Sequence, residues 1–152
     1  MDEADSREDE LQRFEGGRDI RDRASAFASR VVRFCDHLQR NGGVGRLMVP
    51  QLVNCSTSVA GMLEEARAAE SRRDFVSKCC ISLKECREAY GRLRIVETCR
   101  IEPVDEARAL CVEAGELVAI ISAIVRNTKR NSGLPAQGGS RSRIPKSRIP
   151  NS

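Results

Sequence analysis

Aromatic side chains, histidines and long apolar runs are scarce in this chain of 152 residues. Tryptophan is absent, tyrosine occurs once and phenylalanine four times. The core must therefore be built from aliphatic residues, alanine and cysteine, which suits closely packed helices. The longest apolar stretch, Leu117 to Val125, is too short to span a membrane. We therefore expect no membrane partner, and an acidic N-terminus with no signal-peptide pattern predicts a cytoplasmic protein.

Residue types that usually catalyse reactions or bind metals form no recognisable cluster. The single histidine, His37, excludes the paired Glu-x-x-His motifs of di-iron bundles. The seven cysteines include no C-x-x-C pair and fall mostly on apolar helical stripes, which predicts buried reduced thiols rather than a zinc site. We expect no cofactor and no enzymatic activity. One remote alternative is that Arg30 and His37, separated by six residues, match the Arg-x(4 to 6)-His signature of helical ribonucleases; unchanged nuclease activity after His37→Ala would remove it.

Apolar residues that recur at steps of three and four predict four amphipathic helices. We expect them over residues 19–40, 50–69, 71–98 and 103–131. Pro50 and Pro103 suit the first turns of the second and fourth helices, and Ser71 with Asp74 suits an N-terminal cap of the third. Four such helices with short links predict an all-α, antiparallel, up-down-up-down four-helix bundle in one domain.

Two segments of biased composition flank this helical body, which spans residues 18–131. Residues 1–17 carry seven acidic side chains against two arginines, which predicts a disordered acidic arm. Residues 132–152 end in the tandem repeat SRIPK-SRIPN, which predicts a low-complexity basic tail. The body itself holds 20 basic and 15 acidic residues, so it is basic as well.

Basic residues gather on the outward faces of two predicted helices. They are Arg23, Arg30, Arg33 and Arg40 on the first helix and Arg73, Lys84, Arg87 and Arg94 on the third. Such stripes neutralise phosphates, so we expect them to bind the RNA or DNA backbone. The scarcity of aromatics argues against stacking on bases and hence against strong sequence preference. The alternative is a solvated face whose cations pair with acidic neighbours such as Asp36, Glu85 and Glu88.

Three further groups of residues have a structural interpretation. Apolar residues beside the main stripes predict a subunit interface, and they are Val32, Cys80, Ile95, Leu110, Leu117 and Ile124. Polar residues of the second and third helices are expected to form an ion network between them, drawn from Glu64, Glu65, Lys78, Glu85 and Glu88. Cations in the last turn of the fourth helix suit its dipole, and they are Arg126, Lys129 and Arg130.

A series of short motifs occurs in order between residues 51 and 94. They are Gln51-Leu52-x-x-Cys55-x-Thr57-Ser58-Val59, Glu64-Glu65-Ala66, Ser71-x-x-Asp74-Phe75-x-x-Lys78, Ile81-x-Leu83-Lys84-Glu85-x-Arg87-Glu88 and Leu93-Arg94. This series resembles the four-helix-bundle proteins encoded by intervening sequences in bacterial large-subunit ribosomal RNA genes. The chain departs from that pattern at Val53 and Asn54, where the family tends to have two arginines.

The resemblance implies a small cytosolic bundle that assembles as a ring-shaped homopentamer. It extends to the accessory variability protein of diversity-generating retroelements, a similar basic pentameric barrel that binds nucleic acid and a reverse transcriptase. Because of the missing arginines, the resemblance carries fold and assembly further than a nucleic-acid surface. We therefore expect a non-enzymatic, homo-oligomeric accessory protein that binds nucleic acid; the alternative is a protein–protein adaptor with no nucleic-acid role.

Overall fold

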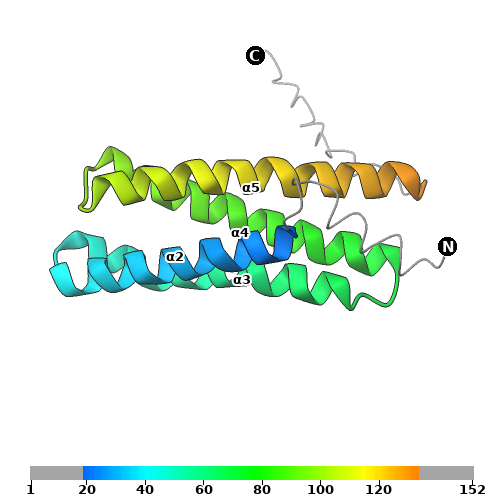
Figure 1. The fold of residues 1–152 in the computed structure, drawn as a ribbon, viewed down its shortest axis with the longest axis horizontal. Coiled ribbons are helices and arrows are strands. Elements are labelled where there is room, and N and C mark those ends of the chain that lie inside the picture. The colour runs from blue at the N-terminus through cyan, green and yellow to red at the C-terminus, as the bar shows by residue number, and fades with distance from the viewer. Residues whose placement is uncertain (1–18, 134–152) are drawn as a thin grey trace, which may run out of the picture.

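Four long helices form the body of the protein in a computed structural model that describes residues 19–133. The predicted acidic arm and the SRIP repeats of the tail lie outside these residues. The elements are α2 (Ile20–Asn41), a short 3-10 helix η1 (Val44–Met48), α3 (Val49–Arg67), α4 (Arg72–Thr98) and α5 (Val104–Asn131). The long helices run alternately up and down, and α3 and α5 flank α4 (Figure 1). This arrangement confirms the predicted all-α four-helix bundle.

Local capping explains where two of the helices begin. Asp19 caps α2, because its Oδ1 accepts a hydrogen bond from the backbone amide of Arg21 at 2.9 Å. Burial works against ionisation of this carboxyl group, but hydrogen bonds from the side chain and backbone of Arg21 outweigh it, so the pKa of Asp19 lies below its ordinary value of 3.8. Ser71 caps α4, and its Oγ accepts from the amide of Asp74 at 3.1 Å, as predicted.

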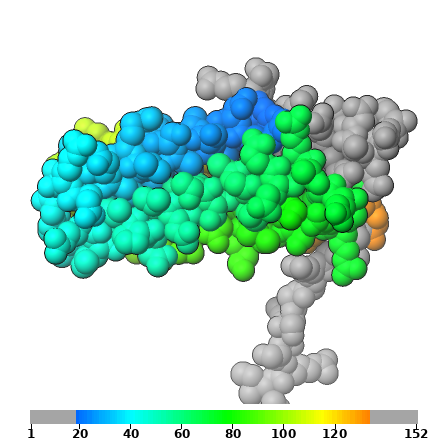
Figure 2. Space-filling view, turned by 90° about the horizontal axis from the view of Figure 1, so that it is seen from below, coloured from blue at the N-terminus to red at the C-terminus, as the bar shows by residue number. Residues whose placement is uncertain are grey.

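The short link expected between the first two helices contains an ordered 3-10 helix. Gly42 follows α2 with a φ of 70°, a conformation that other residues rarely adopt. The chain then forms η1 instead of an irregular loop. A Cβ atom at Gly45 would lie 3.0 Å from Ile101 and 3.3 Å from Leu38, so the absence of a side chain lets η1 pack closely against the end of α2. Figure 2 shows α2, in blue to cyan, beside α3, in cyan to green, on one face of the molecule.

A continuous core runs along the bundle and is built largely from leucine, isoleucine, valine, alanine and cysteine. Two side-chain contacts join α4 to both of its neighbours within this core. The buried Ser82 Oγ donates to the carbonyl of Val59 on α3 at 2.9 Å, and Cys86 Sγ donates to the carbonyl of Ala114 on α5 at 3.6 Å. Such bonds satisfy polar atoms that would otherwise be costly to bury.

Helix α5 is buried over a wider arc than the sequence predicted. Leu110, Leu117 and Ile124 are fully buried, so their assignment to a subunit interface was wrong. The physical reason is that α5 packs against both α4 and α2, which covers two adjacent stripes of its surface. Val32 and Ile95, from the same predicted set, are 41% and 55% exposed.

The cysteines are free thiols, and five of the seven are buried, in line with the prediction of reduced core thiols. Burial raises the pKa of Cys35 and Cys55 to about 11 and that of Cys86 to about 12. Cys99 alone is exposed. Within residues 19–133, no group of three or more His, Cys, Asp or Glu side chains is arranged to hold a metal ion. The same residues include no helix with the length and apolar character to cross a membrane.

Candidate nucleic-acid interface

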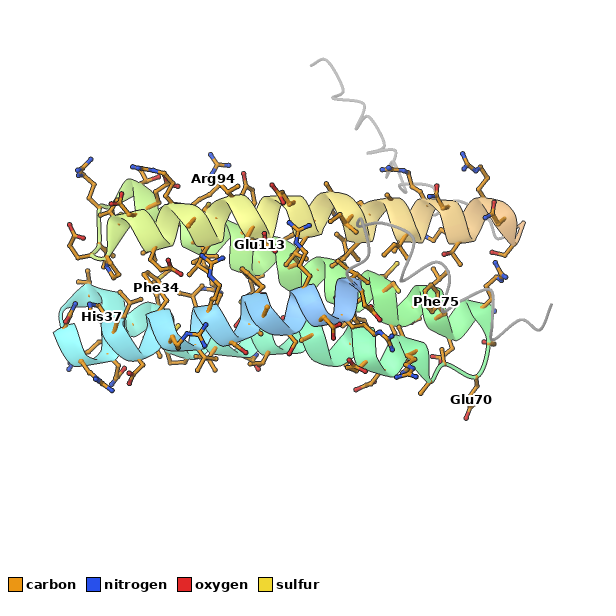
Figure 3. All side chains as sticks on the ribbon, viewed as in Figure 1. Phe34, His37, Glu70, Phe75, Arg94 and Glu113 are labelled. Atoms are coloured by element: carbon orange, nitrogen blue, oxygen red, sulfur yellow. The ribbon has the colours of Figure 1, made fainter. Side chains whose placement is uncertain are left out.

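The basic residues predicted on α2 mostly have carboxylate partners. Arg23 Nε donates to Glu113 Oε1 at 2.6 Å and Arg23 Nη2 donates to Glu113 Oε2 at 2.9 Å, with a further ion pair to Glu116. Arg30 Nη2 lies 3.1 Å from Glu106 Oε1. All three carboxylates belong to α5, and Figure 3 shows Glu113 on the edge of α5 that faces α2. These pairs therefore join α2 to α5.

The remaining two arginines of the predicted α2 stripe differ from each other. Arg40 Nη2 pairs with Asp36 Oδ2 at 2.8 Å within the helix. Arg33 is exposed and forms no ion pair among residues 19–133. Three of the four arginines of the predicted α2 stripe thus already have partners, and among these four only Arg33 offers an external phosphate a charge that is not paired within residues 19–133.

The basic residues predicted on α4 have no carboxylate partners in the part of the chain that the structure describes. They are exposed, and they are Arg73, Lys84, Arg87 and Arg94. A helix turns by 100° per residue, so these four positions fall within an arc of about 80°. Arg94 lies over the ring of Tyr90, 5.6 Å from its centroid, in a cation–π contact.

This arc of α4 borders the side on which α5 packs, because Tyr90 lies about 40° beyond Arg94 around the helix. Tyr90 reaches α5 at Gly115, where an added Cβ would lie 3.5 Å from the tyrosine ring. Among the acidic residues of α4, Glu97 pairs with Arg108 on α5 at 3.2 Å. Glu88 pairs with Arg92 at 2.7 Å within the helix, away from the basic arc.

The predicted ion network between α3 and α4 is present in reduced form. Lys78 Nζ lies 3.3 Å from Glu65 Oε2 on α3 and 3.7 Å from Asp74 Oδ1 on α4. Glu64 and Glu85 form no ion pair among residues 19–133. Lys78 is therefore directed toward α3 and does not belong to the basic arc of α4.

Two cations of α5 that the sequence did not assign to the predicted interface extend the basic arc. Arg126 and Lys129 follow Gly115 by 11 and 14 residues, so the helical repeat places them within about 40° of the line on which α5 meets Tyr90. Neither forms an ion pair within residues 19–133. From the sequence, Arg126 and Lys129 are assigned only to the dipole at the end of the fourth helix. The signal that places them beside α4 is their angular position around α5 relative to Gly115.

Charge is therefore segregated around α5. Its acidic residues Glu106, Glu113 and Glu116 serve α2, whereas its opposite edge carries cations next to α4. Figure 3 shows Arg94 at the edge of α5 away from Glu113.

We call the surface formed by Arg73, Lys84, Arg87, Arg94, Arg126 and Lys129 the α4–α5 basic face. From Arg73 to Arg94 it spans 21 residues, or about 32 Å, the rise of about nine base pairs of duplex.

The two residues of the ribonuclease hypothesis, Arg30 and His37, line one depression between α2 and the start of α5. Arg30 is held there by Glu106, and His37 is exposed. Their proximity supplies groups that can bind a ligand, and a ribonuclease activity stays a hypothesis.

Comparison with known proteins finds a likeness in fold. No protein-family model matches the chain, and no curated protein does. A crystal structure at 1.70 Å of a protein of unknown function from the S23 ribosomal protein family of Bacteroides thetaiotaomicron is similar, with a TM-score of 0.64 and 25% sequence identity. The match covers 70% of this chain and 98% of that protein. The bundle of the present chain is thus similar to that of an S23-family protein over nearly the whole of the latter.

Proposed function

We propose that this chain is a non-enzymatic accessory protein that binds the backbone of RNA or DNA through the α4–α5 basic face. The observation that supports this function is a row of cations that lack carboxylate partners among residues 19–133. Such cations are available to neutralise phosphates and release counterions, whereas the paired arginines of α2 would first have to break an ion pair. The basic residues of α4 therefore form the main part of the proposed interface, and Arg126 and Lys129 of α5 complete it.

The expected mode of binding follows from the side chains present. The face offers charge over about 32 Å, and its one nearby aromatic ring, Tyr90, is half-buried and covered by Arg94. Cations without stacking rings bind phosphates and read little sequence. Binding should therefore be steeply dependent on salt and should tolerate changes of sequence.

The assembly that we propose rests on the family resemblance. Likeness to an S23-family protein supports membership in the bacterial family encoded by intervening sequences of ribosomal RNA genes. On that basis we propose a cytoplasmic, ring-shaped homopentamer, with a reverse transcriptase as one candidate protein partner. Five copies would repeat the basic face and strengthen its field. Native mass spectrometry tests this, because each chain contributes 16.8 kDa; a monomer would contradict the proposed ring.

Nucleic-acid binding is tested by comparing two variants that lose equal charge. The face variant carries Lys84→Gln, Arg87→Gln and Arg94→Gln, and the control variant carries Arg30→Gln, Arg40→Gln and Arg46→Gln. The probe is a labelled 20-nucleotide single strand with hydroxyl ends, and binding is followed by fluorescence anisotropy. We expect the face variant to lose at least about tenfold in affinity at low salt, since each lost phosphate contact weakens binding, and the control to lose much less. Equal losses would contradict a localised interface.

A protein–protein adaptor is the second candidate function, and one observation favours it. Val44 and Leu47 of η1 are each 70% exposed, which is unusual for apolar residues so close together. They lie on the connection between α2 and α3 and are not among the residues of the α4–α5 basic face. If both variants above bind no nucleic acid and neither does the parent protein, adaptor function becomes the better explanation.

A further inference from the structure

A depression lies where α2 meets the first turn of α5, on the side of α5 opposite the α4–α5 basic face. Its volume is about 370 Å³, and it is lined by Arg30, Arg33, Phe34, His37, Pro103 and Glu106. The α2 residues at 30, 33, 34 and 37 share one face of that helix, because they follow steps of three and four. Figure 3 shows Phe34 between α2 and α5, with His37 nearer the end of α2.

Polar groups in this depression have hydrogen-bonding capacity that the protein leaves unused. The side chains of Arg33 and His37 form no hydrogen bond or ion pair among residues 19–133. Both Nε and Nη2 of Arg30 donate to the same oxygen of Glu106, Oε1, at 3.3 and 3.1 Å. The second oxygen, Oε2, accepts no bond in the described part of the chain. The depression therefore combines two donor side chains with one oriented acceptor.

We propose that this depression binds a sugar phosphate in which a phosphate monoester lies beside a free hydroxyl group. The phosphate oxygens accept hydrogen bonds from Arg33 and His37, and the hydroxyl donates to Glu106 Oε2. Phe34 is 3% exposed and forms part of the apolar floor with Pro103. Such a site, with an apolar floor and a few directed polar groups, is the usual form of a small-ligand pocket.

Glu106 distinguishes this ligand from a simple anion. A carboxylate near the phosphate site repels a phosphate group, so Glu106 favours a ligand whose hydrogen-bond donor is separate from the phosphate and reaches Oε2 while the phosphate lies at Arg33 and His37. Hydroxyl groups of a sugar are donors of this kind. Arg30 holds Glu106 in position, because its two bonds fix Oε1 and leave Oε2 directed to the ligand. Arg30 is thus a positioning residue, while Arg33, His37 and Glu106 contact the ligand.

Two sources carry this chemistry: the phosphorylated end of a nucleic-acid strand and a free sugar phosphate. The proposal does not depend on nucleic-acid binding at the α4–α5 basic face, since the depression involves none of the residues of that face. Its failure would leave the proposed function intact. Failure of the proposed function would likewise leave this site to be tested with small molecules.

The first experiment titrates the full chain with ribose 5-phosphate and with inorganic phosphate, followed by ³¹P NMR. The test variant is Arg33→Gln with His37→Gln. The matched control is Arg40→Gln, which changes an exposed arginine of the same helix that does not line the depression. We expect ribose 5-phosphate to bind the parent protein more tightly than inorganic phosphate. The test variant should lose at least about tenfold in affinity, as expected when hydrogen bonds to a charged group are removed, and the control should be unchanged.

A second variant, Glu106→Gln, examines the acceptor separately. Removing its charge should leave inorganic phosphate bound as tightly or more tightly, while the preference for ribose 5-phosphate should fall. Far-UV circular dichroism confirms that each variant is folded. Equal affinities of the parent protein for the two ligands, or an equal loss in the test and control variants, would overturn the proposal.

Oligonucleotides then distinguish the two sources. A 5′-phosphorylated RNA strand that binds more tightly than its 5′-hydroxyl counterpart, with the difference absent in the Arg33/His37 variant, identifies a strand end as the ligand. Ribose 5-phosphate binding without that difference identifies a free sugar phosphate. Saturable binding of neither probe would refute the site.

Discussion

The ion pair between Arg23 and Glu113 should contribute more to stability than any other surface pair of the described bundle. Two nitrogens of Arg23 donate to the two oxygens of Glu113 at 2.6 and 2.9 Å, which is the bidentate geometry of strong charge-assisted bonds. The side chains are only 17% and 21% exposed. The hydrogen bonds to Glu113 raise the pKa of Arg23, so the guanidinium stays charged.

The magnitude follows from this burial. Hydrogen bonds to charged groups contribute about 1.5 to 3 kcal/mol, and a partner left half-buried without its counter-charge adds to the loss. We therefore expect Arg23→Gln to lower the free energy of unfolding by about 2 kcal/mol. The pair between Arg40 and Asp36, with side chains 77% and 58% exposed, serves as the control and should contribute about 0.3 to 0.5 kcal/mol.

Double-mutant cycles measure both pairs. The first combines Arg23→Gln with Glu113→Gln, and the second combines Arg40→Gln with Asp36→Asn. Urea unfolding is followed by far-UV circular dichroism, because the chain has no tryptophan to report by fluorescence. A coupling energy in the first cycle that does not exceed that of the second would refute the assignment of Arg23 to a structural bridge between α2 and α5.

Three further predictions test the core, the first helix cap and the thiols. Leu117→Ala should lower the free energy of unfolding by about 2 to 5 kcal/mol because Leu117 is fully buried, whereas Val112→Ala, at a site 61% exposed, should change it by less than about 0.5 kcal/mol in the same urea assay. The folded-state pKa of Asp19 lies below its unfolded value, so the cap stabilises the protein above that value and the benefit disappears as pH falls through the folded pKa. Asp19→Asn should therefore destabilise the protein near pH 6, and the difference in stability between variant and parent should shrink as pH falls through the folded-state pKa of Asp19; a constant difference would argue against the ionised cap. Cys99 should react with iodoacetamide in the folded protein while the buried thiols react only after denaturation, and peptide mass spectrometry that finds a buried thiol labelled first would contradict the packing.

Periodicity predicted the helices well because each one buries a continuous apolar stripe along its length. Ser71 and the apolar steps of α4 illustrate this, since capping and burial there depend on residues close in sequence. Leu117 was misplaced because it lies beside the main stripe of α5, and its burial depends on how α2 and α4 surround that helix. No local pattern contains that information.

The candidate site was predictable only in part for the same reason. Arg23 and Arg30 look outward on an isolated helix, but their partners Glu113 and Glu106 are 90 and 76 residues away in sequence. Such pairs depend on the rotation and register of α2 against α5. Arg126 was missed because its relation to α4 appears only once the two helices are placed side by side.

The salt dependence of nucleic-acid binding tests the central claim most directly. The logarithm of the binding constant for a single strand falls against the logarithm of salt concentration with a slope of about −0.7 per phosphate neutralised. The variant that replaces Lys84, Arg87 and Arg94 by glutamine removes three cations from the α4–α5 basic face, so we expect its slope to be shallower than that of the parent protein by about 2. The variant at Arg30, Arg40 and Arg46, which loses the same charge elsewhere, should keep a slope close to that of the parent. A face variant with the slope and affinity of the parent protein would contradict phosphate binding by α4 and α5.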